Sequence, residues 1–264
     1  LRYLAPDEYQ FRRELLSLMD LLTGRGETVL FTSQTSPETP DDDLQFMSDG
    51  VLELRRPNGG RVLDVPKFRG AEVTAGPHAV RVDQGGMSVY PRVVPERDGR
   101  PFTRRLTSSG VPALDDLLHG GIELGTTTLF SGPTGIGKTT VSALFLIEAA
   151  RRGHHSVLYH LEEKPETFIE RCAAIDTPVT ELLDDGTLEV VSVTPSLLTV
   201  GEFLGQVQSD VTADTEIVMI DGVQGFEKLT NLSEEREELS ALRSYLTARG
   251  VTVVLTDEMP NITG

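Results

Sequence analysis

The sequence predicts an α/β fold in which a mainly parallel sheet is flanked by helices and is preceded by β-hairpins. Three observations lead to this prediction. Apolar strands and helices alternate along the chain after residue 104. A complete GxxxxGK(S/T) pattern, which is typical of phosphate-binding loops, stands at 132–139 between such a strand and such a helix. Finally, the segment 12–34 recurs at 236–258, so the 264 residues are expected to hold parts of two similar domains.

The repeat is long-range and specific. An offset of 224 residues carries Leu22-Thr23-Gly24-Arg25-Gly26 to Leu246-Thr247-Ala248-Arg249-Gly250, and 11 of the 23 aligned positions are identical. A period of this length corresponds to a domain rather than to a unit of a solenoid. We therefore expect the C-terminal half of a first domain copy at 1–93, a linker at 94–104, and the N-terminal core of a second copy at 105–264.

The first part of the chain is expected to hold one helix, one strand and two hairpins. Apolar side chains recur at helical spacing over 8–24, and a buried strand is expected at 27–32. A loop rich in Ser, Thr, Pro and Asp covers 33–43. Two pairs of strands then flank turns that contain Asn-Gly or Gly-Gly, whose positive φ suits tight hairpins. The paired strands are expected at 51–54 with 61–65 and at 79–82 with 87–90.

After the linker, strands and helices alternate, which is typical of a mainly parallel sheet. The expected strands are 127–131, 156–161, 188–193, 216–221 and 251–256. The expected helices are 138–152, 165–175, 199–211 and 234–248.

Composition narrows the classes of function. The net charge of −17 opposes general binding to nucleic-acid phosphates, which requires clustered Lys and Arg. An acidic excess of this size suits a protein that works in high salt, and an ordinary acidic bacterial or archaeal protein is the alternative. The lone Cys172 excludes an internal disulfide and suits a cytoplasmic protein, most simply as a buried thiol. No apolar run reaches the roughly 18 residues that span a bilayer, so no membrane association is expected.

The strongest functional signal is the phosphate-binding loop. Its glycines allow backbone N–H groups to turn toward phosphates, and the following helix adds the positive end of its dipole. Lys138 is expected to reach the β- and γ-phosphates of a nucleotide, and Thr139 to bind Mg²⁺ through its hydroxyl. The predicted nucleotide-binding residues are Gly132, Pro133, Thr134, Gly135, Ile136, Gly137, Lys138, Thr139 and Thr140. A chance match in a glycine-rich turn is the alternative, and the flanking strand and helix argue against it.

A second motif supports this interpretation. The segment 217–221 consists of four apolar residues and a final Asp221, as in a strand that is buried on both faces of a parallel sheet. Ligands bind at the carboxyl ends of such strands, so Asp221 is expected to hold Mg²⁺ through water. Many strands end in Asp, and the position downstream of a phosphate-binding loop is what makes the pattern informative. The five histidines show no metal-ligand spacing, so no metal site beyond Mg²⁺ is expected.

Two further pairs of charged residues have both a functional and a structural interpretation. Glu162 and Glu163 follow the strand 156–161, where one carboxylate could take a proton from an attacking water, although a solvated strand end explains them equally well. Lys67 and Arg69 alternate on a strand expected at 66–70 and so share one face. They could contact a nucleotide as a charge clamp. Charges that protect an edge strand from aggregation are the simpler explanation.

Together these motifs resemble the KaiC-like branch of the RecA/RadA ATPase superfamily. The resemblance is carried by the lead-in at 105–122, the phosphate-binding loop, Leu161-Glu162-Glu163 and Ile220-Asp221. In the first part of the chain, the segments at 67–70, 76–82 and 86–92 are similar to the closing pattern of such a domain. The resemblance covers nearly the whole chain except the loop at 33–43 and the linker, and it implies a RecA-like core.

The resemblance also changes the interpretation of the charged pairs. It implies that Glu162 and Glu163 include the catalytic carboxylate, and that Lys67 and Arg69 act in catalysis on ATP bound by a neighbouring subunit of a ring. The acidic composition fits a haloarchaeal member. By alignment, the autophosphorylated pair of the family's clock protein corresponds to Gln45 and Phe46, which cannot be phosphorylated. Autokinase activity is therefore not expected from these positions.

Three functions compete. The expected one is that of a Mg²⁺-dependent ATPase that binds ATP and self-associates into a ring, a hexamer by resemblance, with a role in signal transduction or regulation. A DNA-recombination motor of the RecA/RadA type is the alternative from another class. Because the segment 222–238 carries five acidic residues against Lys228 and Arg236, DNA is not an expected partner. The third alternative is a non-catalytic module in which ATP drives only assembly.

The repeat bears on the completeness of the site. With the 224-residue offset, one phosphate-binding loop and one Lys/Arg pair are expected in this chain, and they belong to different copies. Residues 35–93 correspond to the part that the second copy lacks, so we hypothesise that the two parts complement each other as a permuted domain. Nucleotide binding is thus the expectation for this chain, whereas a full catalytic set within one copy is not.

Overall fold

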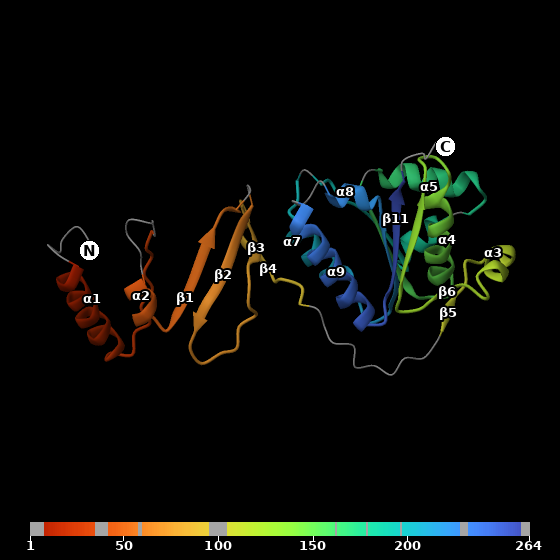
Figure 1. The fold of residues 1–264 in the computed structure, drawn as a ribbon. Helices are drawn as coiled ribbons and strands as arrows, with labels where there is room; N and C mark the ends of the chain where they lie inside the picture. Colours follow the sequence, from red (N-terminus) through yellow and green to blue (C-terminus); the bar gives the residue numbers. More distant parts are fainter. Residues whose placement is uncertain are drawn as a thin grey trace. The chain divides into compact units, whose positions relative to one another are not determined.

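Figure 1 shows the computed structural model of the chain, which describes residues 8–34, 42–57, 60–94, 105–161, 163–177, 179–195, 197–227 and 232–259. The chain forms two compact units. The first comprises residues 1–55 and 63–77, and the second comprises residues 56–62 and 78–264.

The helices are α1 (Glu8–Thr23), α2 (Asp42–Met47), α3 (Pro112–Leu117), α4 (Lys138–Arg151), α5 (Pro165–Ala174), α6 (Thr180–Asp184), α7 (Val200–Asp210), α8 (Val223–Glu227) and α9 (Leu232–Ala248). The strands are β1 (Gly50–Arg55), β2 (Arg61–Phe68), β3 (His78–Asp83), β4 (Gly86–Tyr90), β5 (Leu106–Thr107), β6 (Ile122–Glu123), β7 (Thr127–Gly132), β8 (His155–His160), β9 (Leu188–Ser192), β10 (Thr215–Asp221) and β11 (Thr252–Glu258). Within the described ranges, no helix is both long enough and apolar enough to cross a membrane.

A five-stranded parallel sheet forms the centre of the second unit. Its strand order is β7-β11-β10-β8-β9, and every neighbouring pair is parallel. A strand with helices on both sides must be apolar along its whole length. The central strand β10 meets this requirement, because Ile217, Val218, Met219 and Ile220 are all fully buried. The α/β class and the mainly parallel sheet predicted from the sequence are confirmed.

Helices cover both faces of this sheet (Figure 1). On one face, Phe203 of α7 and Leu246 of α9 belong to a core cluster that includes Val218. On the other face, Phe145 of α4 belongs to a cluster that includes Met219. Neighbouring residues of one strand therefore face opposite layers, as the period-two geometry of a strand requires. The parallel arrangement also brings the carboxyl ends of β7, β8, β10 and β11 to one edge, where ligands bind in folds of this kind.

The elements expected after the linker are all present, and their ends differ from the prediction by at most two residues. The short elements α3, β5, β6, α6 and α8 were not predicted, because elements of two to six residues are too short to show a hydrophobic period. The expected linker at 94–104 lies outside the described residues except for residue 94.

The hairpin predicted at 79–90 forms and packs on α7. Strands β3 and β4 pair antiparallel and belong to the second unit. Their approach to α7 is close enough to require glycine on the helix. A Cβ atom on Gly201 would lie 2.5 Å from the Cβ atom of Ala79, and one on Gly205 would lie 2.5 Å from the Cδ1 atom of Tyr90.

An ion pair fixes the same contact. The Nε atom of Arg81 donates to the carboxylate of Glu202 at 2.8 Å, and its guanidinium donates to the carbonyl of Leu197 at 3.0 Å. Glu202 is buried and also closes the capping box of α7 with Thr199, so the ion pair joins the hairpin to the helix terminus. This hydrogen bond raises the pKa of Arg81.

A segment that precedes the linker thus contacts the core that follows it, as the hypothesis of a permuted domain requires. The assignment of the two parts to two domain copies stays a prediction.

The first unit contains α1, α2, β1 and most of β2. The predicted helix at 8–24 is present as α1, and strands β1 and β2 are neighbours in a sheet.

The prediction of a buried strand at 27–32 is wrong. Residues 27–34 have no regular secondary structure, and Leu30 is 93% exposed. An apolar strand forms only where neighbouring strands satisfy its backbone groups. Among the residues that the structure describes, no strand pairs with this segment.

Candidate nucleotide-binding site

The phosphate-binding loop connects β7 to α4, as predicted. Lys138 is the first residue of α4, and its Nζ atom donates to the carbonyls of Gly132 and Pro133, at 2.9 Å each. The ammonium group is therefore held over the loop. Gly135 has φ +78° and Gly137 has φ +97°, and a Cβ atom at either position would meet nothing within 4 Å. Glycine is needed here for the left-handed backbone, and the space beside it is open to a ligand.

The remaining loop residues are placed by the ends of β11 and α4. The hydroxyl of Thr134 donates to the carboxylate of Glu258, and the backbone N–H of Met259 donates to the carbonyl of Gly132 at 3.2 Å. Ile136 is exposed on the loop, and Thr140 follows Thr139 in the first turn of α4. The carboxyl end of β11 therefore borders the loop, although no site residue was predicted there.

Thr139 and Asp221 converge at the mouth of the loop. The hydroxyl of Thr139 lies 3.0 Å from Oδ1 and 3.1 Å from Oδ2 of Asp221. A second hydroxyl, that of Thr256 on β11, donates to Oδ1 of Asp221 at 2.6 Å. These contacts join the ends of three elements that are distant in sequence. Thr256 was missed in the sequence analysis because a lone threonine near a strand end carries no local signal.

Asp221 is held in its charged form. Burial raises the pKa of this carboxyl, but the adjacent ring of His160 and the hydroxyls of Thr256 and Thr139 outweigh burial, so that the pKa lies below its usual value. An ionised carboxylate beside a threonine hydroxyl offers oxygen ligands, which are the ligands that Mg²⁺ prefers. The residues present therefore fit a Mg²⁺ ion at Thr139 and Asp221.

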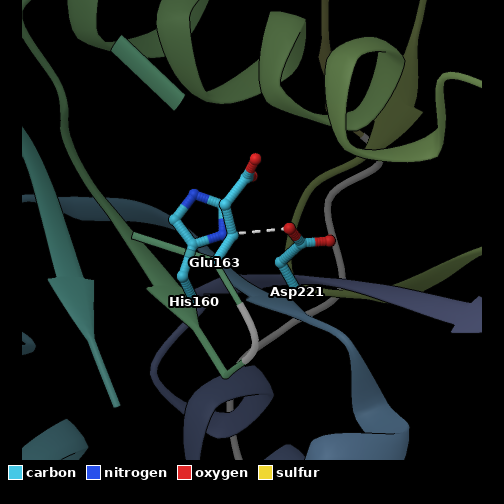
Figure 2. Close-up of side chains that lie close together, drawn as sticks. All are labelled: His160, Glu163 and Asp221. Atoms are coloured by element: carbon cyan, nitrogen blue, oxygen red, sulfur yellow. Dashed lines mark ion pairs between the residues drawn. The ribbon is translucent and has the colours of Figure 1, made fainter. Parts of the chain in front are cut away.

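A histidine stands next to this carboxylate. His160 ends β8 and Asp221 ends the adjacent β10, and the two residues are directly paired in the register of the sheet. The Nδ1 atom of His160 lies 2.9 Å from Oδ2 of Asp221 (Figure 2). Glu163 lies within reach of both, since ligand atoms of the three side chains lie within 4.8 Å of one another. The prediction of no metal site beyond Mg²⁺ was based on the spacing of histidines along the chain, which does not report this register.

The two predicted glutamates have different outcomes. Glu163 lies beside Asp221 and His160, and its carboxylate accepts a hydrogen bond from the guanidinium of Arg171 on α5. Glu162 lies outside the described residues. The catalytic role of either glutamate stays a prediction.

The predicted Lys67 and Arg69 belong to the first unit. Strand β2 ends at Phe68, so the prediction that both cations project from one strand is wrong for Arg69. Lys67 donates to the carbonyls of Gln45 and Phe46 at 3.0 and 2.9 Å, and Arg69 pairs with Asp49 at 3.0 Å. Both cations thus contact the segment 45–49, and their action on a neighbouring subunit's nucleotide stays a prediction.

Comparison with known proteins agrees with these features. The family model described as "ATPase: KaiC" matches residues 2–94 and 107–264. The circadian clock protein KaiC2 of Synechocystis sp. (strain ATCC 27184 / PCC 6803 / Kazusa) is 26% identical over 254 residues, which cover 93% of this chain and 44% of that protein. The circadian clock oscillator protein KaiC of Acaryochloris marina (strain MBIC 11017) is 26% identical over 208 residues, which cover 76% and 40%.

A third relative covers still more of the chain. The circadian clock protein KaiC3 of the same Synechocystis strain is 23% identical over 269 aligned residues, which cover 98% of this chain and 53% of that protein. The chain therefore spans about half of the length of these relatives, or less. Because the family model matches nearly the whole chain on both sides of the linker, the chain belongs to the KaiC family of RecA-superfamily ATPases.

Proposed function

We propose that this chain binds Mg·ATP at the loop between β7 and α4 and hydrolyses it within a ring-shaped regulatory assembly. One observation carries the proposal. The hydroxyl of Thr139 and the carboxylate of Asp221 converge within 3.1 Å at a loop whose first helical residue is Lys138. This arrangement brings a cation site and a phosphate site together at the carboxyl edge of a parallel sheet.

The loop supplies the groups that hold phosphates. In the described structure Lys138 contacts the carbonyls of Gly132 and Pro133, and from this position its ammonium group would reach the β- and γ-phosphates. The backbone N–H groups at the start of α4 and the positive end of its dipole add to the same site. The buried Phe145 and Ala149 anchor α4 in the core, so the loop is positioned before a ligand arrives.

Mg²⁺ would be held by Thr139 directly and by Asp221, and when bound it would neutralise phosphate charge and orient the transferring group. The chain's own residues fix this pair. Thr256 holds Asp221 by a hydrogen bond of 2.6 Å, and the hydroxyl of Thr256 also accepts a hydrogen bond from the backbone N–H of Gly222 at 2.7 Å. The carboxylate is therefore prevented from rotating away from Thr139.

Glu163 is the described carboxylate best placed to accept a proton from the attacking water. Its side chain is partly exposed, which leaves it accessible, and Arg171 orients it through a charged hydrogen bond. Family resemblance makes Glu162 the second candidate. The cations Lys67 and Arg69 would act on the nucleotide of a neighbouring copy, which is why we propose a ring. The proposed regulatory role is supported by the relatives, which are circadian clock proteins.

Binding is tested with a fluorescent ATP analogue and Mg²⁺. Lys138→Ala is expected to weaken binding at least about tenfold, because a charge-assisted hydrogen bond to phosphate is lost. Lys164→Ala is the matched control, since Lys164 is an exposed lysine next to the same edge of the sheet. Equal affinities of the wild type and Lys138→Ala would contradict nucleotide binding at this loop.

Hydrolysis is tested separately by phosphate release. Glu163→Gln is expected to reduce turnover at least about a hundredfold with ATP affinity retained, as for the loss of a general base. Glu166→Gln, an exposed residue in the first turn of α5, is the control. If Glu162→Gln and Glu163→Gln both leave turnover unchanged, the base lies elsewhere or the chain uses ATP only for assembly.

Two further measurements address the assembly and the competing DNA-dependent function. Light scattering after size exclusion is expected to show a ring-sized species only with ATP, and a monomer at every nucleotide concentration would contradict the ring. The net charge of −17 opposes DNA binding. Tight binding to single-stranded DNA that weakens steeply with salt would instead support a recombination motor.

A further inference from the structure

The cluster of His160, Glu163 and Asp221 contains a group that Mg·ATP binding does not require. We infer that these three side chains form a second cation site, which takes a divalent transition metal such as Mn²⁺ through one imidazole nitrogen and two carboxylates. The site would lie beside the Mg²⁺ position and share Asp221 with it.

The fold itself assembles the three ligands. His160 and Asp221 are paired residues at the carboxyl ends of adjacent parallel strands, so their side chains lie at the same edge. Glu163 follows three residues after His160 and lies at the same edge (Figure 2). Because two of the ligands are on strands of the rigid core, their positions do not depend on a ligand being present.

The state of His160 is the independent observation that points to a ligand. Its side chain is 0% exposed, yet neither ring nitrogen makes a hydrogen bond of acceptable geometry with any residue that the structure describes. The Nδ1 atom lies close to Asp221 without the alignment of a hydrogen bond. A buried polar group without a hydrogen bond is destabilising, so a buried histidine in this state requires an explanation.

A shared metal ion explains the geometry. Metal–ligand distances of about 2.0–2.2 Å place two ligands at right angles about 2.8–3.1 Å apart, and the 2.9 Å between His160 Nδ1 and Asp221 Oδ2 falls in this range. Glu163 is 27% exposed and leaves an entry path from solvent. The ring of His160 lies 5.2 Å from that of Phe168, and this packing limits its rotation. Glu163 also binds Arg171, so a metal ion would share this carboxylate with the guanidinium group.

The nitrogen ligand determines which metal is preferred. Mg²⁺ takes oxygen ligands and seldom gives up water for imidazole, whereas transition metals accept mixed nitrogen and oxygen donors. The two carboxylates balance the charge of a divalent ion. The hydroxyl of Thr139 contacts both oxygens of Asp221, whereas Thr256 contacts only Oδ1 and His160 lies beside Oδ2. The carboxylate is thus placed to join two neighbouring cation positions, as in sites with two metal ions.

The test uses Mn²⁺ alone with the full chain and no nucleotide, so its outcome does not depend on whether the chain hydrolyses ATP. Pulsed electron paramagnetic resonance detects the nuclear coupling between bound Mn²⁺ and an imidazole nitrogen. We expect about one Mn²⁺ per chain with nitrogen coupling. His160→Gln is expected to abolish that coupling and to weaken Mn²⁺ binding at least about tenfold. A tenfold excess of Mg²⁺ is expected to leave the nitrogen-coupled signal in place.

Two variants keep the test decisive. His154→Gln is the matched control, because His154 lies 3.4 Å from Glu216 but is not part of a three-ligand cluster among the described residues. Its signal is expected to equal that of the wild type. Glu163→Gln, which changes a partly exposed side chain, is expected to weaken Mn²⁺ binding without removing the nitrogen coupling of the remainder, and circular dichroism confirms the fold of each variant.

Three outcomes would overturn the inference. They are Mn²⁺ binding without nitrogen coupling in the wild type, coupling that persists in His160→Gln, or no Mn²⁺ binding at millimolar concentration. Each of them would leave His160 as a buried partner of Asp221 only. None of them bears on ATP binding at Lys138, which the fluorescence assay measures independently.

Discussion

The same sequence pattern occurs twice in this chain but adopts a different structure each time. Residues 12–34 and 236–258 share 11 of 23 positions. Both begin with a long helix, α1 or α9, and both continue through the same turn. The second copy then forms β11 between β7 and β10, whereas residues 27–34 of the first copy have no regular secondary structure.

The local structure of the two copies is the same in detail. Gly26 has φ +80° and Gly250 has φ +79°. In the first copy the backbone N–H of Glu27 donates to the carbonyl of Leu22 at 3.1 Å, and in the second the N–H of Val251 donates to that of Leu246 at 3.0 Å. This hydrogen bond and the left-handed glycine are the signature of a helix C-cap. Helix, cap and turn are therefore specified by residues close in sequence.

The environment of the two copies differs. Leu18 is 38% exposed, whereas the aligned Leu242 is 1% exposed within the cluster that covers one face of the sheet. Burial of a leucine side chain stabilises a protein by about 1.5–3 kcal/mol, and α9 gains this at several positions that α1 leaves partly in solvent. Identical residues thus specify a helix twice, but a strand only where neighbouring strands and a covering layer exist.

The largest expected difference concerns the strand itself. Val254 is fully buried in β11, and the aligned Leu30 is almost fully exposed. Val254→Ala is expected to lower the free energy of unfolding by about 2–3 kcal/mol, because it removes buried methyl groups and leaves a cavity. Leu30→Ala is expected to change it by less than about 0.5 kcal/mol. Urea unfolding followed by circular dichroism measures both, and similar losses would show that residues 27–34 are buried in the native protein.

A smaller difference is expected at the aligned threonines Thr256 and Thr32. Thr256 donates to Asp221 at 2.6 Å, so Thr256→Val removes a hydrogen bond to a buried carboxylate that binds Mg²⁺ in the proposed function. Such a bond is worth about 1.5–3 kcal/mol, and Mg·ATP affinity is expected to fall by at least about tenfold. Thr32→Val serves as the control, because Thr32 is exposed, and its affinity is expected to equal that of the wild type. Equal effects of the two variants would contradict the assignment of the site to the second copy alone.

Local patterns explain what could be predicted from the sequence. The loop at 132–139, the helix that begins at Lys138 and the apolar strand that ends at Asp221 each depend on residues within one element, and all three are where the sequence places them. The prediction of a strand at 27–32 was wrong because it used only a local pattern. That pattern matches β11, but a segment's own sequence does not show whether neighbouring strands will pair with it. A pattern predicts what a segment can form, and tertiary contacts decide whether it forms.

The residues missed in the site are those that only the sheet register brings together. His160 and Asp221 are separated by 61 positions along the chain and are paired in β8 and β10. Thr256 and Glu258 reach the loop because β11 lies beside β7 in register, with Glu258 opposite Gly132. Once the strand order is known, this register identifies them. The strand order itself depends on nonlocal packing, which single-sequence patterns do not report.

The smallest expected effects test the part that the two copies share. Ala in place of Gly26 or Gly250 must adopt a left-handed backbone, which costs about 1–2 kcal/mol for a residue with a Cβ atom. If the cap is specified locally, Gly26→Ala and Gly250→Ala are expected to lose the same local stability. Hydrogen exchange at the last turns of α1 and α9 measures it, and each variant is expected to speed exchange in its own helix by about tenfold.

The two variants are nevertheless expected to differ in their global effect. Gly250 is joined through Val251 to β11, which lies in the core. The strain that Gly250→Ala introduces is therefore expected to lower the free energy of global unfolding as well. Gly26 precedes a segment outside the sheet, so Gly26→Ala is expected to reduce only the local stability at the end of α1. Gly24→Ala is the matched control, because the aligned residue is Ala248 and alanine is the better helix former. Slower exchange in Gly24→Ala together with faster exchange in Gly26→Ala would assign the effect to the left-handed position. A lower free energy of global unfolding in Gly26→Ala would instead mean that the first copy is coupled to a folded core as tightly as the second.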